Sequence, residues 1–308
     1  MKQQQVTVQV PATTANLGPA FDCLGMTLDI WNCLQVGIGE RPAVFIEGHG
    51  SSNLPLDETN LVYRSCVRLF KEVGAQQPAL LISCYNRIPL ERGLGSSGAA
   101  IVSGLVAANY LVGQPLSIKA LLSLATEMEG HPDNVTAALL GGAQIVVQGE
   151  QGLITSALKV PSDLRVVLYV PDGTISTSKA RRVLPKRVSY GDAIFNMGRV
   201  AMLVNAFAGG RLQDLYVGTQ DRLHQSYREG LFPAMKLIIK EALKAGALGA
   251  FVSGSGPTVI ALARGREMTI AYEMAEAARK ANAPGETLIT RPSSRGVRLV
   301  EPLSEEDA

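Results

Sequence analysis

The hydrophobic positions change their period along the chain, and these changes predict a mixture of strands and helices. Residues 6–10 alternate between apolar and polar side chains, as a half-buried strand does. Residues 59–73 space their apolar side chains three or four apart, which predicts an amphipathic helix. Similar patterns predict further strands at 26–38, 42–47, 79–85, 143–148, 164–170, 250–252 and 258–262, and a last strand within 287–299. They predict further helices at 99–111, 116–128, 135–140, 190–210, 232–245 and 268–282.

These strands and helices do not alternate with a regular βαβ order, so they indicate an α+β fold. The pattern changes near 155–165, and we expect two lobes, residues 1–158 and residues 159–308. The sequence contains no internal repeat and no long linker. We expect the acidic end, residues 304–308, to be frayed.

One stretch, residues 93–118, carries no charged side chain and could be mistaken for a membrane span. Asn109, Gln114 and Pro115 interrupt it, together with several Gly and Ser residues, so it lacks the roughly 18 consecutive apolar residues that a span needs. A buried helix is expected here, and no membrane association.

Composition narrows the function classes. The 308 residues are 46% hydrophobic and 18% charged, with a formal net charge of +2, which excludes disorder and argues against a nucleic-acid partner. The four cysteines form no C-x-x-C pair, and residues 1–10 show no apolar signal segment, so we predict a cytoplasmic location. Three histidines provide no zinc-binding spacing.

The strongest local signal is a loop rich in Gly and Ser at residues 89–99, just before a predicted helix. Small residues allow close approach of the backbone to a ligand, and the N–H groups of such a loop and of a helix start attract phosphate. The alternative is a Ser N-cap that follows a Gly turn. The nucleotide-binding residues predicted here are Pro89, Leu90, Glu91, Arg92, Gly93, Leu94, Gly95, Ser96, Ser97, Gly98 and Ala99.

This loop is neither of two well-known phosphate loops. It fits the G-x-G-x-x-G spacing of dinucleotide-binding folds, but no acidic residue follows between Ala99 and Thr126 to bind a ribose. A Walker A loop requires Gly-Lys, and the chain contains no Gly-Lys pair. A different type of phosphate-binding loop is therefore predicted.

Two further loops are dense in Gly, Ala and polar residues. The first, PATTANLGPAFDCLG at residues 11–25, contains Asn16 and Asp22. The second, SGSGPT at residues 253–258, contains Gly254. Taken alone, each is typical of a turn.

The three loops taken in this order resemble those of the GHMP small-molecule kinases, and the resemblance runs over almost the whole chain. The first loop is similar to that of the homoserine kinases in this family, with Ala20 in place of their usual Gly. The stretch HPDNV at residues 131–135 also resembles theirs, with a shorter connection before it. The resemblance implies a two-lobed GHMP-kinase fold, with an N-terminal nucleotide-binding lobe and a C-terminal ferredoxin-like lobe.

The resemblance also implies ATP and Mg²⁺ as cofactors. Asn60 matches a position of the adenine pocket, although it could simply cap the following helix. Ser97 and Glu127 match the metal-binding Ser and Glu, with Ser96 and Glu129 as the alternatives. Asp133 matches the catalytic Asp of mevalonate kinase relatives, so Asp133, Glu127 and Ser97 form the expected catalytic set. For homoserine kinases the resemblance implies instead that the glycine-rich loop and Mg²⁺ stabilise the transition state without a strong base, so the role of Asp133 as a base stays open.

The implied substrate is the small zwitterion L-homoserine, phosphorylated on its hydroxyl to O-phospho-L-homoserine on the route to threonine. Arg181 and Arg228 are expected to bind its carboxylate, because arginine binds carboxylates through two parallel hydrogen bonds. The full set of expected substrate-binding residues is Asn16, Asp22, His131, Asn134, Thr177, Arg181, Arg228 and Gly254.

Two other functions remain open from the sequence. One is another GHMP kinase with a mevalonate-type alcohol as substrate, which would not need the two arginines. The other is a nucleotide-binding regulator on the same fold that has lost catalysis. The resemblance also implies a homodimer, although no residue pattern locates an interface.

Overall fold

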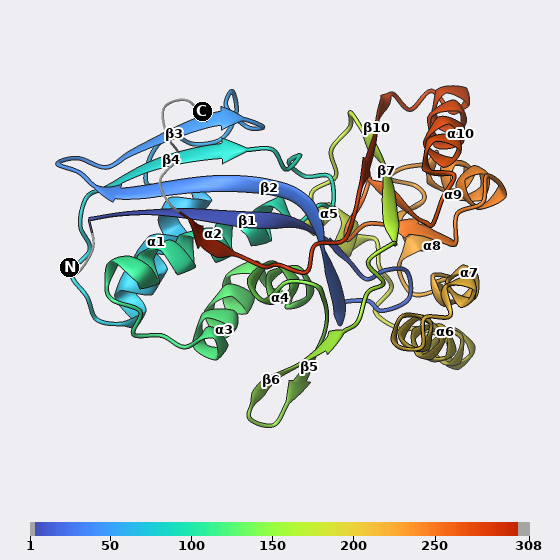
Figure 1. Ribbon diagram of the computed structural model, residues 1–308, viewed down its shortest axis with the longest axis horizontal. Helices are drawn as coiled ribbons and strands as arrows, with labels where there is room; N and C mark the ends of the chain where they lie inside the picture. Colours follow the sequence, from blue (N-terminus) through green and yellow to red (C-terminus); the bar gives the residue numbers. More distant parts are fainter. Residues whose placement is uncertain (1–3, 301–308) are drawn as a thin grey trace.

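The computed structural model describes residues 4–300, so the acidic residues 304–308 lie outside the described range. The chain folds into two lobes that lie side by side, each built on its own β-sheet (Figure 1). No helix of the described residues is long and apolar enough to cross a membrane.

The N-terminal lobe contains a seven-stranded sheet in the order β11-β1-β2-β4-β3, with β5 pairing β2 and β6 pairing β5. Its long central strands β1 and β2 are antiparallel, and only β3 and β4 pair in parallel. The strands are β1 (Gln5–Ala15), β2 (Leu24–Ile38), β3 (Ala43–Gly48), β4 (Leu80–Asn86), β5 (Ala143–Gly149), β6 (Gly152–Leu158) and β11 (Arg298–Val300).

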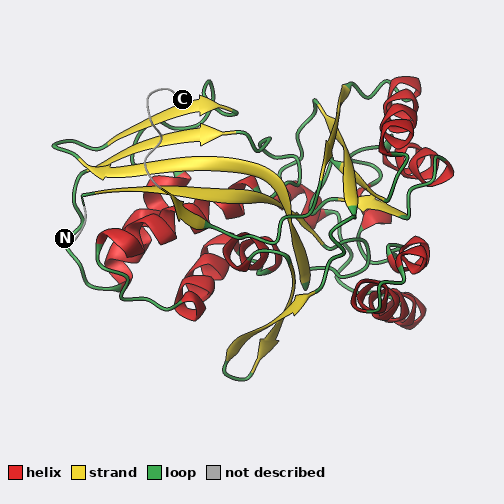
Figure 2. Ribbon diagram, in the orientation of Figure 1, coloured by secondary structure: helices red, strands yellow, loops and turns green. Residues whose placement is uncertain are grey.

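Helices cover one face of this sheet (Figure 2). They are α1 (Leu61–Glu72), α2 (Ser96–Leu111), α3 (Ile118–Glu129) and α4 (Asp133–Leu140). The uncharged stretch forms α2, which packs against β1, α1, α3 and α4 and buries most of its side chains. A helix that is apolar on all sides needs such enclosure, and the prediction of a buried helix is therefore confirmed.

The C-terminal lobe contains a four-stranded antiparallel sheet in the order β10-β7-β9-β8. Its strands are β7 (Arg165–Pro171), β8 (Gly249–Val252), β9 (Val259–Ala263) and β10 (Gly285–Thr290). With α9 between β7 and β8, and α10 between β9 and β10, the lobe has the βαββαβ order of a ferredoxin-like fold. Its helices are α5 (Thr177–Arg182), α6 (Tyr190–Ala208), α7 (Leu215–Gly218), α8 (Gln225–Arg228), α9 (Met235–Lys244) and α10 (Glu267–Lys280).

After Arg165 the strand β7 is apolar, which fits the burial of both of its faces. Val167 and Tyr169 pack with α9 and α10 in a core of the C-terminal lobe. Val166 and Leu168 point the other way, into a core that continues through the N-terminal lobe. One of these two cores is therefore common to both lobes, which fixes the site between them.

The division expected after residue 158 separates the strands of the two sheets with one exception. The last strand, predicted within 287–299, is in fact two strands in different lobes. β10 completes the C-terminal sheet, and β11 then pairs with β1 at the edge of the N-terminal sheet. The chain thus returns to the first lobe at its end (Figure 1).

The other differences from the sequence predictions have local causes. β1 continues to Ala15, through residues expected to be loop, because a register shift between Pro11 and Ala12 accommodates a residue that cannot donate a hydrogen bond. The strand β6 was not predicted, since its side chains are mostly exposed in a hairpin with β5. The helices α5, α7 and α8 were also not predicted, because each is too short to show a helical period.

Candidate active site

The three loops singled out in the sequence meet between the lobes. The carbonyl of Gly93 accepts a hydrogen bond from Ser253 Oγ at 2.6 Å, and that of Leu94 accepts one from the Thr13 N–H at 3.1 Å. The N–H of Gly254 donates to the carbonyl of Ala15 at 3.2 Å. Loops that are far apart in the sequence therefore form one hydrogen-bonded unit.

Two glycines of the central loop are required by this packing. Gly93 and Gly95 have φ angles of 75° and 70°, in the left-handed region that favours glycine. A Cβ at Gly93 would lie 2.1 Å from the carbonyl oxygen of Ser253, and one at Gly95 would lie 1.9 Å from Thr13 Oγ1. These glycines thus allow the loop to approach other parts of the protein, in addition to any approach to a ligand.

The loop leads into α2, whose first turn is open to a ligand. The N-cap residue Gly95 makes no side-chain cap hydrogen bond. The N–H groups of the first turn of a helix have no partner within the helix, so they form an anion site when no side chain caps them. Ser96 and Ser97 in this turn line both cavities described below.

The larger of these cavities has a volume of about 640 Å³ and lies between the central loop and the start of α1. Asn60 lines it, but its side chain is already bound: Oδ1 accepts from the Val62 N–H at 2.9 Å and Nδ2 donates to the Pro55 carbonyl at 2.8 Å. Asn60 is therefore the N-cap of α1, the alternative noted in the sequence. Arg92 also lines this cavity, and its guanidinium donates to the carbonyls of Leu90, Pro171 and Asp172.

Ser97 has a carboxylate partner, but it is not Glu127. The Ser97 hydroxyl donates to Glu129 Oε1 at 2.6 Å. The side chain of Glu127 is 63% exposed and pairs with Arg68 at 3.1 Å, whereas that of Glu129 is 8% exposed. The structure thus places Glu127 outside both cavities and Glu129 inside the smaller one, because residues two apart on a helix point in different directions. Burial raises the pKa of Glu129.

The smaller cavity has a volume of about 170 Å³ and adjoins the larger one at Glu91, Ser96 and Ser97. All of the substrate-binding residues expected from the sequence line it. They are Asn16, Asp22, His131, Asn134, Thr177, Arg181, Arg228 and Gly254. Phe21 and Ser255 line it as well and were not predicted.

Charged side chains dominate one side of this smaller cavity. Arg181 Nη1 and Nη2 donate to the two carboxylate oxygens of Asp22 at 2.9 and 2.7 Å, so the pair is bidentate. The guanidinium of Arg228 lies near Arg181 and is almost fully buried. Burial, together with the charge of Arg181, lowers the pKa of Arg228 to about 10. Both guanidinium groups lie over the ring of Phe21, at 5.4 and 5.6 Å from its centre.

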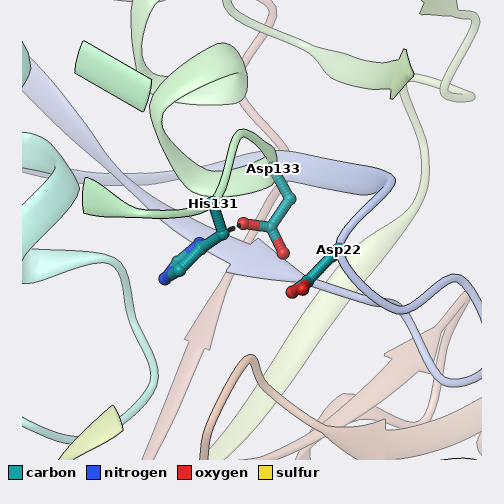
Figure 3. A group of neighbouring side chains, drawn as sticks. All are labelled: Asp22, His131 and Asp133. Atoms are coloured by element: carbon teal, nitrogen blue, oxygen red, sulfur yellow. Dashed lines mark hydrogen bonds and ion pairs between the residues drawn. The ribbon is translucent and has the colours of Figure 1, made fainter. Parts of the chain in front are cut away.

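Asp133 and His131 form the other side of the cavity (Figure 3). Asp133 Oδ1 lies 2.7 Å from His131 Nδ1, and it also accepts the Asn134 N–H at 2.7 Å. His131 Nε2 lies 3.7 Å from Glu129 Oε1. Burial alone would lower the pKa of His131, but the hydrogen bond to Asp133 and the two carboxylate charges outweigh it and raise the pKa.

Asp22, His131 and Asp133 come close enough to suggest a metal site, since one ligand atom from each lies within 4.8 Å of the others. However, Asp22 is bound by Arg181, and Asp133 accepts hydrogen bonds from His131 and Asn134. With these donors already in place, the cluster is better suited to a polar substrate than to a cation (Figure 3).

Comparisons with known proteins agree with this arrangement. Residues 60–142 match the family model described as GHMP kinases N terminal domain, and residues 206–281 match GHMP kinases C terminal. The match in the N-terminal lobe includes the central loop, α2, α3 and α4. The match in the C-terminal lobe includes α9 and α10, the two helices of the ferredoxin-like order. The fold and the site thus define a kinase of small molecules.

Individual relatives narrow the class. A homoserine kinase of Carboxydothermus hydrogenoformans is 44% identical over 94% of this chain and 95% of its own length. One of Desulfitobacterium hafniense is 44% identical over 83% of this chain and 86% of its own length. A crystal structure of homoserine kinase from Cytophaga hutchinsonii, 29% identical, superposes with a TM-score of 0.86 over 97% of this chain and 98% of that one. The chain therefore belongs to the homoserine kinases of the GHMP kinase family.

Proposed function

We propose that this protein transfers the γ-phosphoryl group of ATP to the side-chain hydroxyl of L-homoserine, forming O-phospho-L-homoserine for threonine biosynthesis. The observation that carries the proposal is the pair of adjoining cavities. One has the size for a nucleotide, the other has the size and charges for a small zwitterion, and Ser96 and Ser97 line both. Phosphoryl transfer needs donor and acceptor to meet at such a junction.

In this proposal the ATP phosphates lie at the first turn of α2. The uncapped N–H groups there and the positive end of the helix macrodipole attract the phosphates without a lysine. Asn60 contributes by holding the start of α1 against the larger cavity, since its own polar atoms are already bonded. Arg92 contributes by tying the loop to the C-terminal lobe.

Ser97 and Glu129 would hold Mg²⁺. Magnesium prefers hard oxygen ligands, and this hydroxyl and carboxylate lie together where the two cavities meet. A buried carboxylate with a raised pKa is stabilised by a cation, which supports the fit. When bound, Mg²⁺ supplies positive charge to the β and γ phosphate oxygens.

The Asp22–Arg181 pair suits a substrate that carries both charges. The ammonium group of homoserine would bind the carboxylate of Asp22, and its carboxylate would bind the guanidinium groups of Arg181 and Arg228. Asp22 and Arg181 are only partly buried and neutralise each other before binding, so neither is an unpaired charge in the free enzyme. Asn16 and Thr177 line the same cavity and offer further polar groups.

Asp133 is the group proposed to assist the departure of the hydroxyl proton. It is almost fully buried in the cavity wall, and its hydrogen bonds to His131 and to Asn134 fix its orientation. A loose transition state requires little help from a base, so positioning of the hydroxyl is expected to matter as much as proton transfer.

The experiment is an ADP-release assay with Mg²⁺ and ATP, run separately with L-homoserine, mevalonate, shikimate and galactose. ADP release that depends on homoserine alone supports the proposal. Release with mevalonate instead identifies another GHMP kinase, and no turnover with any substrate identifies a nucleotide-binding regulator.

A homodimer and a cytoplasmic location are further proposals. The first is based on the resemblance to homoserine kinases. The second is supported by the four cysteines, Cys23, Cys33, Cys66 and Cys84, which are all unpaired among the described residues.

A further inference from the structure

Arg228 is a buried charged residue of the substrate cavity whose hydrogen-bond donors need partners. Its side chain is only 3% exposed, and a buried guanidinium costs several kcal/mol unless its donors are well paired. Within residues 4–300, its hydrogen bonds use Nε, which donates to the Ala180 carbonyl at 3.4 Å, and Nη1. The two N–H bonds of Nη2 therefore remain for a ligand in the cavity that Arg228 lines.

Nη1 has two acceptors that fix the plane of the guanidinium. One is the carbonyl of Gly254, at 2.6 Å, which belongs to the third glycine loop. The other is Nδ1 of His224, at 3.1 Å. His224 is the N-cap residue of α8 and lies one turn before Arg228. The side chain of His224 is fully buried.

The second nitrogen of His224 determines which tautomer is present. Nε2 lies 2.6 Å from the carbonyl oxygen of Gly18, which can only accept a hydrogen bond. Nε2 must therefore carry the proton, and Nδ1 is left bare as an acceptor for Arg228. Burial lowers the pKa of His224, so the neutral form is favoured.

The backbone that carries His224 is held by a buried carboxylate. Asp221 Oδ2 accepts the N–H groups of His224 and Gln225 at 3.0 and 2.7 Å. Asp221 Oδ1 accepts the Leu223 N–H and Asn196 Nδ2 at 2.9 and 2.7 Å. These four hydrogen bonds fix the turn before α8, and the imidazole is thereby held between Gly18 and Arg228.

We propose that His224 is a positioning residue for substrate binding: its Nδ1 holds the guanidinium of Arg228 so that Nη2 can bind the carboxylate of the substrate. His224 also links two parts of the site, because Gly18 belongs to the first glycine loop with Asn16 and Asp22. The proposal rests on the proposed function, in that the ligand of Arg228 is taken to be the amino acid's carboxylate.

Two conservative substitutions distinguish the role of Nδ1 from that of Nε2 in His224. In His224→Asn the amide oxygen can take the place of Nδ1, so the acceptor for Arg228 is kept. In His224→Gln the amide nitrogen can take the place of Nε2, so the donor to Gly18 is kept and the acceptor is lost. We expect the homoserine KM to rise about tenfold in His224→Gln, as for the loss of a hydrogen bond to a charged group, and by no more than about threefold in His224→Asn.

The ATP KM should stay within about twofold of wild type in both variants, since a structural defect would affect both substrates. Tyr169→Phe is the matched control: it removes a partly buried hydrogen bond to the Ala283 carbonyl in the same lobe, and its homoserine KM should equal that of wild type. Equal homoserine KM values in His224→Gln and His224→Asn, or a wild-type value in His224→Gln, would overturn the proposal.

A measurement on the wild-type protein needs neither substrate nor variant activity. The ¹⁵N NMR spectrum of ring-labelled histidine should show His224 protonated at Nε2 and bare at Nδ1, with His224→Asn used to assign its signals. A proton on Nδ1 would contradict the proposal even if homoserine is the substrate. Absence of homoserine-dependent ADP release together with the expected tautomer would instead refute the proposed function alone.

Discussion

The hydroxyl of Ser97 donates a 2.6 Å hydrogen bond to Glu129, which brings the start of α2 and the end of α3 together at the junction of the two cavities. If this pair holds Mg²⁺, Glu129→Gln removes the charge that binds the cation and keeps the shape. We expect kcat to fall by about 100-fold and the Mg²⁺ concentration for half-maximal rate to rise, both measured by ADP release at varied Mg²⁺.

Glu127→Gln is the matched control, because Glu127 lies two residues away and pairs with Arg68 at the surface. An exposed ion pair contributes at most about 1 kcal/mol to stability, so kcat and the Mg²⁺ dependence should stay at wild-type values. A larger loss of activity in Glu127→Gln than in Glu129→Gln would show that Glu129 is the wrong carboxylate.

Asp133→Asn tests the proposed proton acceptor. The amide oxygen can keep the hydrogen bonds that Asp133 Oδ1 accepts from His131 and Asn134, so the fold should be preserved. We expect kcat to fall by about 10- to 100-fold, at the low end for a general base because the transition state is loose. Wild-type kcat in this variant, with an unchanged melting temperature, would remove Asp133 from the mechanism.

Asp22→Asn tests the binding of the substrate ammonium. The variant leaves Arg181 without its bidentate partner and removes from the smaller cavity the carboxylate that is proposed to bind the ammonium group. We expect the homoserine KM to rise by about 10- to 100-fold, and the ATP KM by much less. Asp214→Asn removes another Asp–Arg pair of similar distance, with Arg211 at the surface, and should leave both values unchanged. Equal increases in both KM values in Asp22→Asn would argue against the assignment.

Gly95→Ala tests whether the central loop depends on its packing against the first loop. The added Cβ would clash with Thr13 Oγ1, and the left-handed φ adds about 1 kcal/mol of strain. We therefore expect a loss of at least about 2 kcal/mol in the free energy of unfolding, measured with denaturant, and a higher ATP KM. Gly74→Ala has a similar φ of 64° with no atom near the new Cβ, so it should show the strain alone. Similar losses in both variants would mean that the contact with Thr13 is unimportant.

The buried His224 predicts a loss of stability in mild acid. Burial lowers its pKa below the ordinary 6.5, with the nearby charge of Arg228 adding to the effect and Asp221 opposing it. Below about pH 6.5 the unfolded chain therefore binds a proton that the folded protein does not, and stability falls as the pH falls, by up to about 1.4 kcal/mol per pH unit. The pKa of His131 is raised, so the stability that its protonation contributes is lost only as the pH rises above 6.5.

The measurement is the free energy of unfolding between pH 5 and pH 8 in wild type and in His224→Asn. The variant has no group with this titration, so its curve should be flatter below about pH 6.5. Parallel curves for the two proteins would show that His224 does not control the acid response.

The sequence predicts a helix or strand well where the hydrophobic positions of that segment follow a single period. The helix α2 carries no charged side chain and the strand β7 is apolar after Arg165, and both are mostly buried by their surroundings. The hairpin strand β6 has no such surroundings, and the return of β11 to the first sheet depends on a pairing with β1 that no local pattern encodes. The continuation of β1 beyond Pro11 depends on a bulge that only the partner strand reveals.

The candidate site divides in the same way. The glycine loops and charged residues of the sequence predicted many of the residues that line the two cavities. The sequence did not predict the direction of each side chain, which depends on the helix that carries it. Glu127 and Glu129 are two positions apart in the sequence. The orientation of the last turn of α3 directs Glu129 into the cavity and Glu127 toward the surface. His224 showed no signal in the sequence, because its role comes from contacts with Gly18 and Arg228 across the fold.

The most direct test of the central claim is the chemical identity of the product. The protein is incubated with Mg²⁺, ATP and L-homoserine, and the reaction is followed by ³¹P NMR. The proposed function predicts one equivalent of ADP for each equivalent of a phosphomonoester whose phosphorus couples to the methylene protons next to the homoserine oxygen. Formation of inorganic phosphate alone, or no consumption of ATP, would contradict it.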